Sequence, residues 1–299
     1  MTSMQPRTTG ATAPSQGDEP LPGAGRTALV TGASSGIGAE TARSLQRLGY
    51  TVYGAARRMD RLAPLEVEGI RPLSMDITDD ASLVAGVDKV IAETGRVDVL
   101  VNNAGYGSYG AIEDVPLEEA RRQFDVNVFG LGRLVQLATP HMREQGSGLI
   151  VNVSSMGGRF TTPLGGWYHA TKYAVEALSD ALRMELAPFG IDVVVVEPGG
   201  IRSEWSGIAA DHLESVGRSG AYARQVRAVA GTLRNRRMER LQSAPSVIAQ
   251  TVAEAATATR PKTRYVVGFS AKPLVALSRV LPDRAFDRVI GLAMGTGRG

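Results

Sequence analysis

Thr31-Gly32-Ala33-Ser34-Ser35-Gly36-Ile37-Gly38 is the stretch that decides the fold. It follows a short apolar run at 27–30, and residues 39–48 after it have the spacing of a helix. Glycines at such a strand-to-helix junction permit a tight turn and let a pyrophosphate approach the positive N-terminus of the helix. A plain glycine-rich turn is the alternative, but the place of the motif at the first junction favours a phosphate-binding loop.

Short apolar runs rich in β-branched residues alternate with helical stretches from Arg26 onwards. This alternation is typical of βαβ units, whose strands form a parallel sheet. We expect strands at 27–30, 51–55, 70–74, 97–101, 149–153, 191–196 and 264–267. Seven strands, most of them followed by a helix, predict a single α/β domain of the doubly wound (Rossmann) type. Such a domain has a seven-stranded parallel sheet flanked by helices and binds ligands beyond the carboxyl ends of its strands.

The composition argues against several classes of site. The 299 residues include no cysteine, which rules out disulfides, thiolate metal sites and cysteine nucleophiles, and the three scattered histidines argue against a histidine metal site. The net charge of +3 is spread along the chain rather than gathered in a stripe, so nucleic-acid binding is not supported. No apolar run reaches the ~18 residues of a membrane span, and the N-terminus does not have the order of a secretion signal. We therefore expect a cytoplasmic protein.

The chain divides into three parts. Residues 1–25 are rich in Thr, Pro, Gly and Ala and predict a flexible tail, whereas residues 26–270 form the domain. Within the domain the pattern loosens over 203–244, which fits either a mobile segment that covers the substrate or a surface insertion. Residues 271–299 are an amphipathic extension that can pack on its own domain, bury against a second subunit or lie on a membrane. The scarcity of flanking lysines and aromatic residues makes membrane contact the weakest of the three.

A second motif, Tyr168-His169-Ala170-Thr171-Lys172, carries the chemistry. Residues four apart lie on one face of a helix, and residues 170–186 have helical spacing, so the phenol and the ammonium face the same way. An exposed helical pair would have the same spacing. Lys172, however, is one of only four lysines in a chain whose other cationic side chains are arginines. We therefore interpret the pair as catalytic.

Two further features make the sequence resemble a known family. The first loop has the spacing Gly-x-x-x-Gly-x-Gly rather than the Gly-x-Gly-x-x-Gly of most dinucleotide-binding loops. Asn102-Asn103-Ala104-Gly105 follows the fourth predicted strand. Together with the motif at 168–172, these features resemble the short-chain dehydrogenase/reductase family, and the resemblance extends from Arg26 to Val267.

The resemblance implies a catalytic site of four residues. Tyr168 would be the acid/base that exchanges a proton with the substrate oxygen, and Lys172 would favour the tyrosinate and bind the cofactor ribose. Ser155 lies thirteen residues before Tyr168, which is the family's spacing for the serine that hydrogen-bonds the carbonyl oxygen; Ser154 is the competing candidate. Asn127, expected within a helix after the fourth strand, matches the asparagine that holds a water linking the lysine to solvent.

The resemblance also implies which residues bind a nicotinamide dinucleotide. They lie on the glycine loop, after the second, third, fourth and sixth strands, and on the catalytic helix. They are Gly32, Ser34, Ser35, Gly36, Ile37, Gly38, Arg57, Arg58, Asp76, Ile77, Asn103, Ala104, Gly105, Tyr168, Lys172, Pro198, Gly199, Ile201 and Ser203. Ser203 stands where the family commonly has a threonine, so a hydroxyl is kept. For Asp76, capping of a helix is the alternative role.

The preferred cofactor follows from the end of the second strand. An NAD-selective site usually has an acidic residue about 20 residues past the glycine motif, but this chain has Arg57 and Arg58 there. Arginine can bind a 2′-phosphate through charge-assisted hydrogen bonds, so NADP(H) is favoured over NAD(H). Asp60 close by, and Ser35 where some NADP-dependent members have a basic residue, count against that preference.

The substrate is expected to be a small molecule with a carbonyl or alcohol group. The segments 154–158, 166–168 and 260–265 look more like hydroxysteroid and retinol dehydrogenases than sugar reductases. Apolar side chains near the expected site favour an apolar substrate such as a steroid, a retinoid or an aromatic ketone, although the same side chains could belong to the core. These are Met156, Phe160, Leu164 and Trp167. The resemblance further implies a homodimer or homotetramer.

Two other functions remain compatible with the fold. A non-catalytic NADP-binding sensor or scaffold is one, because a fold does not fix a function; the four filled catalytic positions argue against it. An epimerase or dehydratase with tightly held NAD is the other. The paired arginines and the short C-terminal region argue against that activity.

Overall fold

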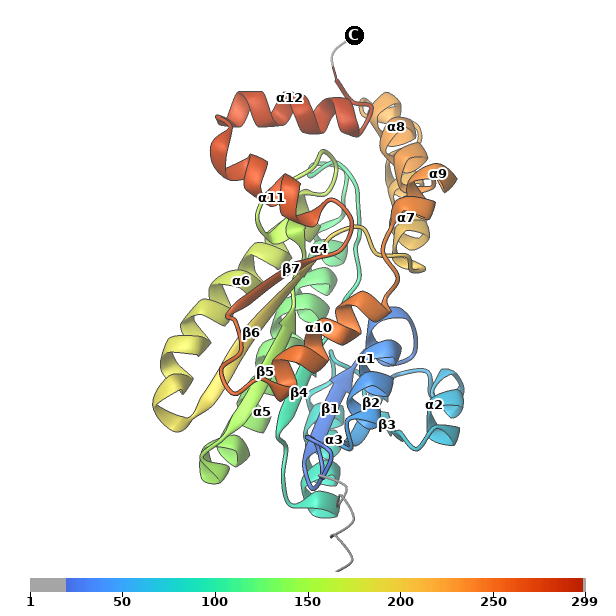
Figure 1. Cartoon of the computed structure of the whole chain (residues 1–299). Helices are drawn as coiled ribbons and strands as arrows, with labels where there is room; N and C mark the ends of the chain where they lie inside the picture. Colours follow the sequence, from blue (N-terminus) through green and yellow to red (C-terminus); the bar gives the residue numbers. More distant parts are fainter. Residues whose placement is uncertain (1–19, 298–299) are drawn as a thin grey trace, which may run out of the picture.

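The computed structural model describes residues 20–297, along which strands and helices alternate (Figure 1). The strands are β1 (Thr27–Thr31), β2 (Thr51–Ala56), β3 (Arg71–Ser74), β4 (Val99–Asn102), β5 (Gly148–Val153), β6 (Ile191–Pro198) and β7 (Arg264–Val267). The helices that flank them are α1 (Gly36–Arg47), α2 (Ala63–Val67), α3 (Asp80–Thr94), α4 (Leu117–Phe124), α5 (Gly130–Gln145), α6 (Gly166–Leu186) and α10 (Ser246–Thr257).

All seven strands run parallel in one sheet with the order β3-β2-β1-β4-β5-β6-β7. The order reverses between β1 and β4, and in such sheets the crevice beyond the carboxyl ends at this reversal binds the ligand. The predicted fold is thus confirmed, and the predicted strand ends differ from the observed ones by one or two residues. β6 continues to Pro198, for example, because its pairing with β7 runs as far as Val267.

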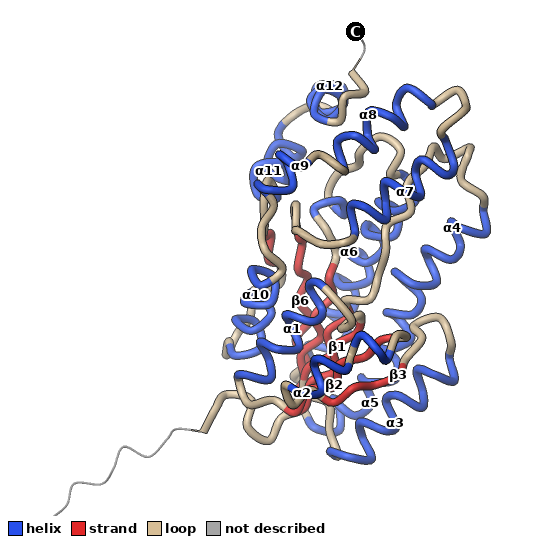
Figure 2. The backbone as a smooth tube through the Cα atoms, turned by 90° about the vertical axis from the view of Figure 1, so that its right-hand side faces the viewer, coloured by secondary structure: helices blue, strands red, loops and turns tan. Residues whose placement is uncertain are grey.

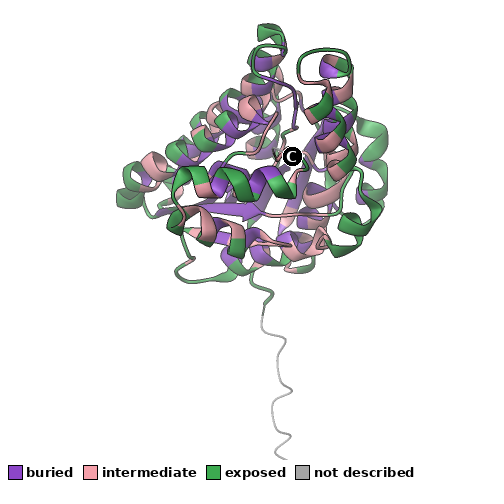
Figure 3. Cartoon of the chain, turned by 90° about the horizontal axis from the view of Figure 1, so that it is seen from above, coloured by how far each residue is buried: buried purple, intermediate pink, exposed green. Residues whose placement is uncertain are grey.

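Helices cover both faces of the sheet, which leaves the strands buried between two apolar layers (Figure 3). On one face, α1 and α10 contribute the fully buried Ala42, Leu45, Ile248 and Val252. On the other face, α3, α5 and α6 contribute Leu83, Leu134, Met142 and Val175. Burial on both faces explains why β6 contains the unbroken apolar run 193–196 instead of alternating polar and apolar residues.

The predicted N-terminal tail lies largely outside the described residues, which begin at residue 20. Residues 20–25 contact the domain. The Gly23 amide donates to the Leu48 carbonyl at 2.8 Å, and a Cβ at Gly23 would come within 2.2 Å of the Tyr50 ring. The packed part of the chain therefore begins before Arg26.

Two groups of helices lie beyond the carboxyl ends of the strands (Figures 1 and 2). One group occupies the segment 203–244 and consists of α7 (Trp205–Gly217), α8 (Ala223–Leu233) and α9 (Arg236–Leu241). The other is the C-terminal extension, with α11 (Ala271–Val280) and α12 (Asp283–Ala293). The ring of Phe286 on α12 lies 5.3 Å from the ring of Phe160, centroid to centroid, so the extension packs on its own domain.

Candidate active site

Tyr168 and Ser155 meet at the carboxyl edge of the sheet. Tyr168 lies in the first turn of α6, and Ser155 follows the end of β5. Burial raises the pKa of the Tyr168 phenol to about 12, and a hydrogen bond with Ser155 opposes that shift. Ser154, the competing serine, is buried, with its hydroxyl next to the position of Gly158. Ser155 is therefore the serine that contacts Tyr168.

Lys172 lies one helical turn after Tyr168, as the spacing predicts. Its Nζ donates to the Val153 carbonyl at 3.0 Å and lies 5.9 Å from the centroid of the Tyr168 ring. Burial lowers the pKa of this ammonium to about 8, because the charged form loses its hydration. A Cβ at Gly105 would lie 3.8 Å from Nζ, so the glycine at the end of the 102–105 tetrapeptide borders the lysine.

Asn127 lies in a π-helical turn, Asp125–Phe129, between α4 and α5 rather than in a regular α-helix. Its Oδ1 accepts from the Tyr106 amide at 3.0 Å, and its Nδ2 donates to the Tyr106 carbonyl at 2.9 Å and to Thr171 Oγ1 at 3.1 Å. The wider turn directs this buried amide at the loop after β4 and at α6 together. Asn127 therefore connects the loop that borders Lys172 with the catalytic helix.

His169 holds the loop between β5 and α6 in place. The Thr162 amide donates to its Nε2 at 3.1 Å, which leaves Nδ1 to donate to the Gly157 carbonyl at 2.9 Å. This pattern assigns the neutral tautomer with the proton on Nδ1, and burial lowers the pKa of the imidazole in agreement. His169 thus fixes the turn that carries Ser155.

The glycine loop is shaped by close contacts with the end of β4. Gly32 has φ +66, and a Cβ there would lie 2.9 Å from Asn103 Nδ2. A Cβ at Gly38 would come within 2.3 Å of the Gly32 carbonyl oxygen. Thr31 Oγ1 accepts from the amides of Asn103 and Ala104, each at 3.0 Å, and so ties the two loops together.

This cradle fits a dinucleotide. The backbone amides at the N-terminus of α1 face the space beyond β1, and Ser35, Gly36 and Ile37 lie at this end of the helix. A Cβ at Gly36 would meet only the Ser203 side chain, at 3.8 Å, so the approach to the helix N-terminus is open. An anion is favoured at such an open N-terminus, and no side chain of the first helical turn is acidic.

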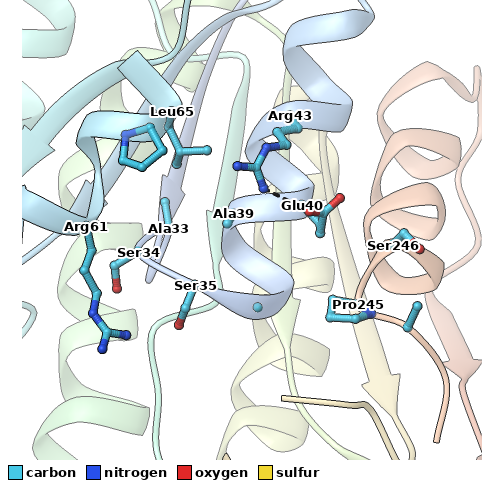
Figure 4. A pocket seen from close by; sticks show the side chains of 13 residues that line it. Ala33, Ser34, Ser35, Ala39, Glu40, Arg43, Arg61, Leu65, Pro245 and Ser246 are labelled. Carbon is cyan, nitrogen blue, oxygen red and sulfur yellow. Dashed lines mark hydrogen bonds and ion pairs between the residues drawn. The ribbon is translucent and has the colours of Figure 1, made fainter. Parts of the chain in front are cut away.

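Arginines border the outer side of the glycine loop. Arg58 Nη2 donates to Ser34 Oγ at 3.5 Å, and the charge of Arg57, after the Thr78 hydrogen bonds, helps to hold the pKa of Asp76 below its usual value. Beside the loop is a hollow of about 540 Å³, which is also lined by Arg61 and by the start of α10 (Figure 4). Arg61 forms an ion pair with Glu204 at 3.1 Å, which connects this side to the start of α7.

Asp76 and Ile77 follow β3. Asp76 Oδ1 accepts from the Thr78 amide at 3.0 Å and from its hydroxyl at 2.8 Å. Burial acts to raise the pKa of Asp76, but the Thr78 hydrogen bonds and nearby arginines together lower it. Asp79, not Asp76, caps α3 by accepting from the Ala81 amide.

The segment after β6 turns back toward the sheet. A Cβ at Gly199 would come within 2.3 Å of the Phe269 carbonyl oxygen, so only glycine fits after Pro198. Ile201 pairs with Ser243, and Ser203 Oγ accepts from the Trp205 amide at 3.4 Å. The residues expected to contact a nicotinamide thus lead directly into α7.

The comparison with known families decides the identity. A family model described as short chain dehydrogenase matches residues 26–212. The chain belongs to the short-chain dehydrogenase/reductase family. It is therefore an NAD(P)-dependent oxidoreductase, and the family predicted from the glycine loop and the Tyr168 motif is confirmed.

Relatives cover nearly the whole of this short-chain dehydrogenase/reductase. It is 35% identical to the probable short-chain type dehydrogenase/reductase VdlC of Helicobacter pylori, with 89% of this chain and 97% of that protein covered. It is 34% identical to the NADPH-dependent 3-dehydrocapnine reductase of Ornithobacterium rhinotracheale, with 88% and 95% covered. The crystal structure of a short-chain dehydrogenase from Streptomyces avermitilis matches with a TM-score of 0.75 and 35% identity, over 87% of this chain and 94% of that one.

One feature of the oxidoreductase was not predicted from its sequence, namely the aromatic cover over Tyr168. The Trp205 ring at the start of α7 lies 5.2 Å from the Tyr168 ring, and the Tyr109 ring lies 5.8 Å from each of them. A Cβ at Gly107 would come within 2.3 Å of the indole, so that glycine makes room for Trp205. The only available signal was that Trp205 is one of two tryptophans and follows the Pro198-Gly199 turn closely.

No helix within residues 20–297 combines the length and the apolar character needed to cross a membrane. The same part of the chain contains no group of three or more His, Asp or Glu side chains placed to hold a metal ion.

Proposed function

We propose that this protein interconverts a carbonyl and an alcohol with NADP(H) as cofactor and Tyr168 as the acid/base. The observation that carries the proposal is the meeting of Tyr168, Ser155 and Lys172, with Lys172 next to Gly105 of the loop that also contacts Gly32 of the glycine loop. Asn127 joins them through the Tyr106 loop and Thr171. A phenol, a hydroxyl and an ammonium in this arrangement supply a proton and stabilise charge on a substrate oxygen.

Each residue of the site has a separate role in the proposed reaction. Ser155 donates a hydrogen bond to the carbonyl oxygen, and Tyr168 Oη gives that oxygen its proton. The nearby Lys172 ammonium stabilises the tyrosinate that remains and binds the ribose of the cofactor. Asn127 positions the water that returns a proton to this pair. The bound nicotinamide supplies or accepts the hydride at the substrate carbon.

NADP(H) is proposed as the preferred cofactor. Arg57 and Arg58 follow β2 directly and Arg58 contacts the glycine loop, whereas the nearest acidic residue, Asp60, comes two residues later. A guanidinium binds a phosphate more strongly than a ribose hydroxyl because its hydrogen bonds are charge-assisted. The NADPH-dependent relative supports the same preference.

An apolar substrate such as a steroid, a retinoid or an aromatic ketone is proposed, with residues 203–244 as its cover. Tyr168 belongs to a cluster of aromatic and aliphatic side chains. The cluster includes Tyr109, Trp205 from α7 and Leu164 from the loop before α6. Such a wall favours an apolar molecule with one polar group at the catalytic end. Tyr168 is 7% exposed, so α7 must move before a substrate enters.

A homodimer or homotetramer is proposed, with a subunit interface on the outer face of α4, α5 and α6. Phe129 is 63% exposed and Leu178 39% exposed, and together with Phe124 they border an apolar hollow of about 550 Å³. Exposed apolar patches of this kind are typical of subunit interfaces.

A cytoplasmic location remains a prediction from the absence of cysteine.

The test follows NADPH and NADH oxidation in parallel with ketosteroids, retinaldehyde, aromatic ketones and small sugars. We expect turnover with NADPH and the bulky apolar carbonyls. Tight NADPH binding without turnover of any carbonyl would contradict the catalytic proposal and favour a cofactor sensor. Equal affinity for NADH and NADPH would contradict only the cofactor preference.

A further inference from the structure

A cluster of buried charges lies directly behind the catalytic lysine. Glu176, on α6, has a side chain only 7% exposed, and Glu197, on β6, has none of its side chain exposed. Arg159 Nε donates to Glu197 Oε1 at 3.0 Å, and its Nη2 lies 3.7 Å from Glu176 Oε2. Arg264, on β7, donates through Nε to Glu176 Oε2 at 3.1 Å. The cluster therefore joins α6 to β6 and β7.

Residues 153, 154 and 155 follow one another at the end of β5, and each of them contacts a different residue of α6. The Val153 carbonyl accepts from Lys172 Nζ, and the Ser155 hydroxyl contacts Tyr168. Ser154 between them forms a hydrogen bond with Glu176, and its Oγ and the Glu176 Cγ both lie 2.9 Å from the position of a Cβ at Gly158. Glu176 is thus the residue one helical turn beyond Lys172, on the inner side of the same helix.

Packing alone does not explain the carboxylate. Among the described residues, Glu197 Oε2 is buried without a hydrogen-bond partner. Burial raises the pKa of Glu176, although hydrogen bonds with Ser154 and Arg264 oppose that shift. A buried charge cluster of this kind is costly, and apolar side chains of similar volume often serve stability equally well. A buried acid kept at such cost, one turn from an equally buried ammonium, points to a role in the site.

We propose that Glu176, held by Arg159 and Arg264, is a positioning residue for Lys172 whose negative charge keeps the buried ammonium protonated. The proposal rests on the proposed function, because Lys172 matters only if Tyr168 exchanges a proton. Lys172 has one hydrogen-bond acceptor among the described residues, the neutral Val153 carbonyl. A carboxylate on the same helix supplies the charge that the carbonyl does not, and it raises the pKa of Lys172 against the effect of burial.

Charged and titratable groups face this pair from every element packed against it. Arg159 comes from the turn after β5, Glu197 from β6 and Arg264 from β7. On α6 itself, Tyr168 precedes Lys172, Tyr173 follows it, and Asp180 accepts from Arg264 Nη2 at 2.6 Å. Asp180 shares Arg264 with Glu176 but lies one turn farther from the lysine. It is therefore a matched control for the loss of one carboxylate from the cluster.

The direct test is the titration of Lys172 by NMR. The chain has only four lysines, so labelling lysine with ¹³C at Cε and comparing with Lys172→Met assigns the resonance. In Glu176→Gln we expect the pKa of Lys172 to fall by about one unit, because an opposite charge at this range is lost. In Asp180→Asn we expect an unchanged value. An unchanged value in Glu176→Gln, or equal shifts in both variants, would overturn the proposal.

Turnover gives the second readout. With NADPH and a reducible ketone, the alkaline limb of the kcat profile should move to lower pH by about one unit in Glu176→Gln but not in Asp180→Asn. If Glu176→Gln does not fold, the double variant Glu176→Leu with Arg264→Leu removes one charge of each sign and should lower the Lys172 pKa in the same way. The NMR titration needs no turnover, so a Lys172 shift in a protein without activity would contradict the proposed function and leave the electrostatic role of Glu176 intact.

Discussion

The Trp205 indole covers Tyr168, with ring centroids 5.2 Å apart and the planes inclined at 55°. The two residues lie on different elements, α7 and α6, and Gly107 leaves the space that the indole fills. Access to the phenol therefore depends on the position of α7. Because Trp205 packs on Tyr109 as well, movement of the helix breaks two aromatic contacts together.

Trp205 itself can report this movement. In a Trp167→Phe background it is the only tryptophan, and we expect its emission to shift to the red when a ketone substrate binds, because the indole leaves its apolar packing. The measurement is a fluorescence titration in the presence of NADPH. The Trp205→Phe variant, which retains Trp167, is the control. An unchanged emission maximum in the Trp167→Phe protein on ketone binding would show that Trp205 does not move.

Gly38→Ala should weaken cofactor binding. The added Cβ would meet the Gly32 carbonyl oxygen at 2.3 Å and Asn103 Nδ2 at 2.6 Å, and the backbone of Gly32 cannot give way cheaply. We expect the Kd for NADPH to rise at least about tenfold, ~1.4 kcal/mol, measured by NADPH fluorescence. Gly231→Ala in α8 is the control, since nothing lies within 4 Å of its Cβ position. NADPH affinity unchanged in Gly38→Ala would refute the role of the loop.

Local patterns in the sequence predicted the sheet and the two motifs well. The glycine loop and the spacing between Tyr168 and Lys172 depend on neighbours in the chain, and the structure has both as predicted. The choice of Ser155 over Ser154 as the catalytic serine also came from spacing and stays a prediction, although Ser155 is the serine that contacts Tyr168. The π-helical turn at Asn127 was not predicted, because one extra residue in a turn leaves the helical pattern nearly unchanged.

Contacts between distant segments could not be predicted. The cover by Trp205 depends on how α7 folds back over the sheet, and Trp205 has no periodic pattern that indicates this. Glu176 falls on the inner face of α6, but its arginine partners come from other elements, Arg159 from a turn before the helix and Arg264 from β7, 88 residues later. Such tertiary pairings can be predicted only when the order of the strands in the sheet is known.

Tyr168→Phe should remove turnover and keep the cofactor. The variant loses only the phenolic oxygen that gives its proton to the substrate, so kcat should fall about 10²–10⁴-fold while the Kd for NADPH stays the same. The measurement is steady-state reduction of the best ketone together with NADPH binding. Tyr173→Phe on the same helix, with its side chain 44% exposed, is the control and should keep full activity. Unchanged turnover in Tyr168→Phe would falsify the assignment of the acid/base.

Arg58→Ala should weaken NADPH binding and leave NADH binding unchanged. A charge-assisted hydrogen bond to the 2′-phosphate is worth about 1.5–3 kcal/mol, which corresponds to about 10–100-fold in Kd. Arg71→Ala is the control, because Arg71 is also an exposed arginine but forms an ion pair with Glu93 on the outer edge of the sheet. Equal losses for both cofactors would mean that Arg58 supports the fold of the loop instead of the phosphate.

Lys172→Met should make the protein more stable at neutral pH while removing its activity. The pKa of Lys172 falls from 10.5 to about 8 on folding, so the unfolded chain binds more protons than the folded one between these two values. The resulting cost to folding is complete below about pH 8 and disappears as the pH rises to 10.5. Removing the charge should therefore raise the free energy of unfolding by about 1–3 kcal/mol at pH 7, and the gain should be lost by about pH 10.5. Urea unfolding of both proteins at pH 7 and pH 10.5 measures this difference. A gain that is the same at both pH values would show that better packing, not the buried charge, is its cause.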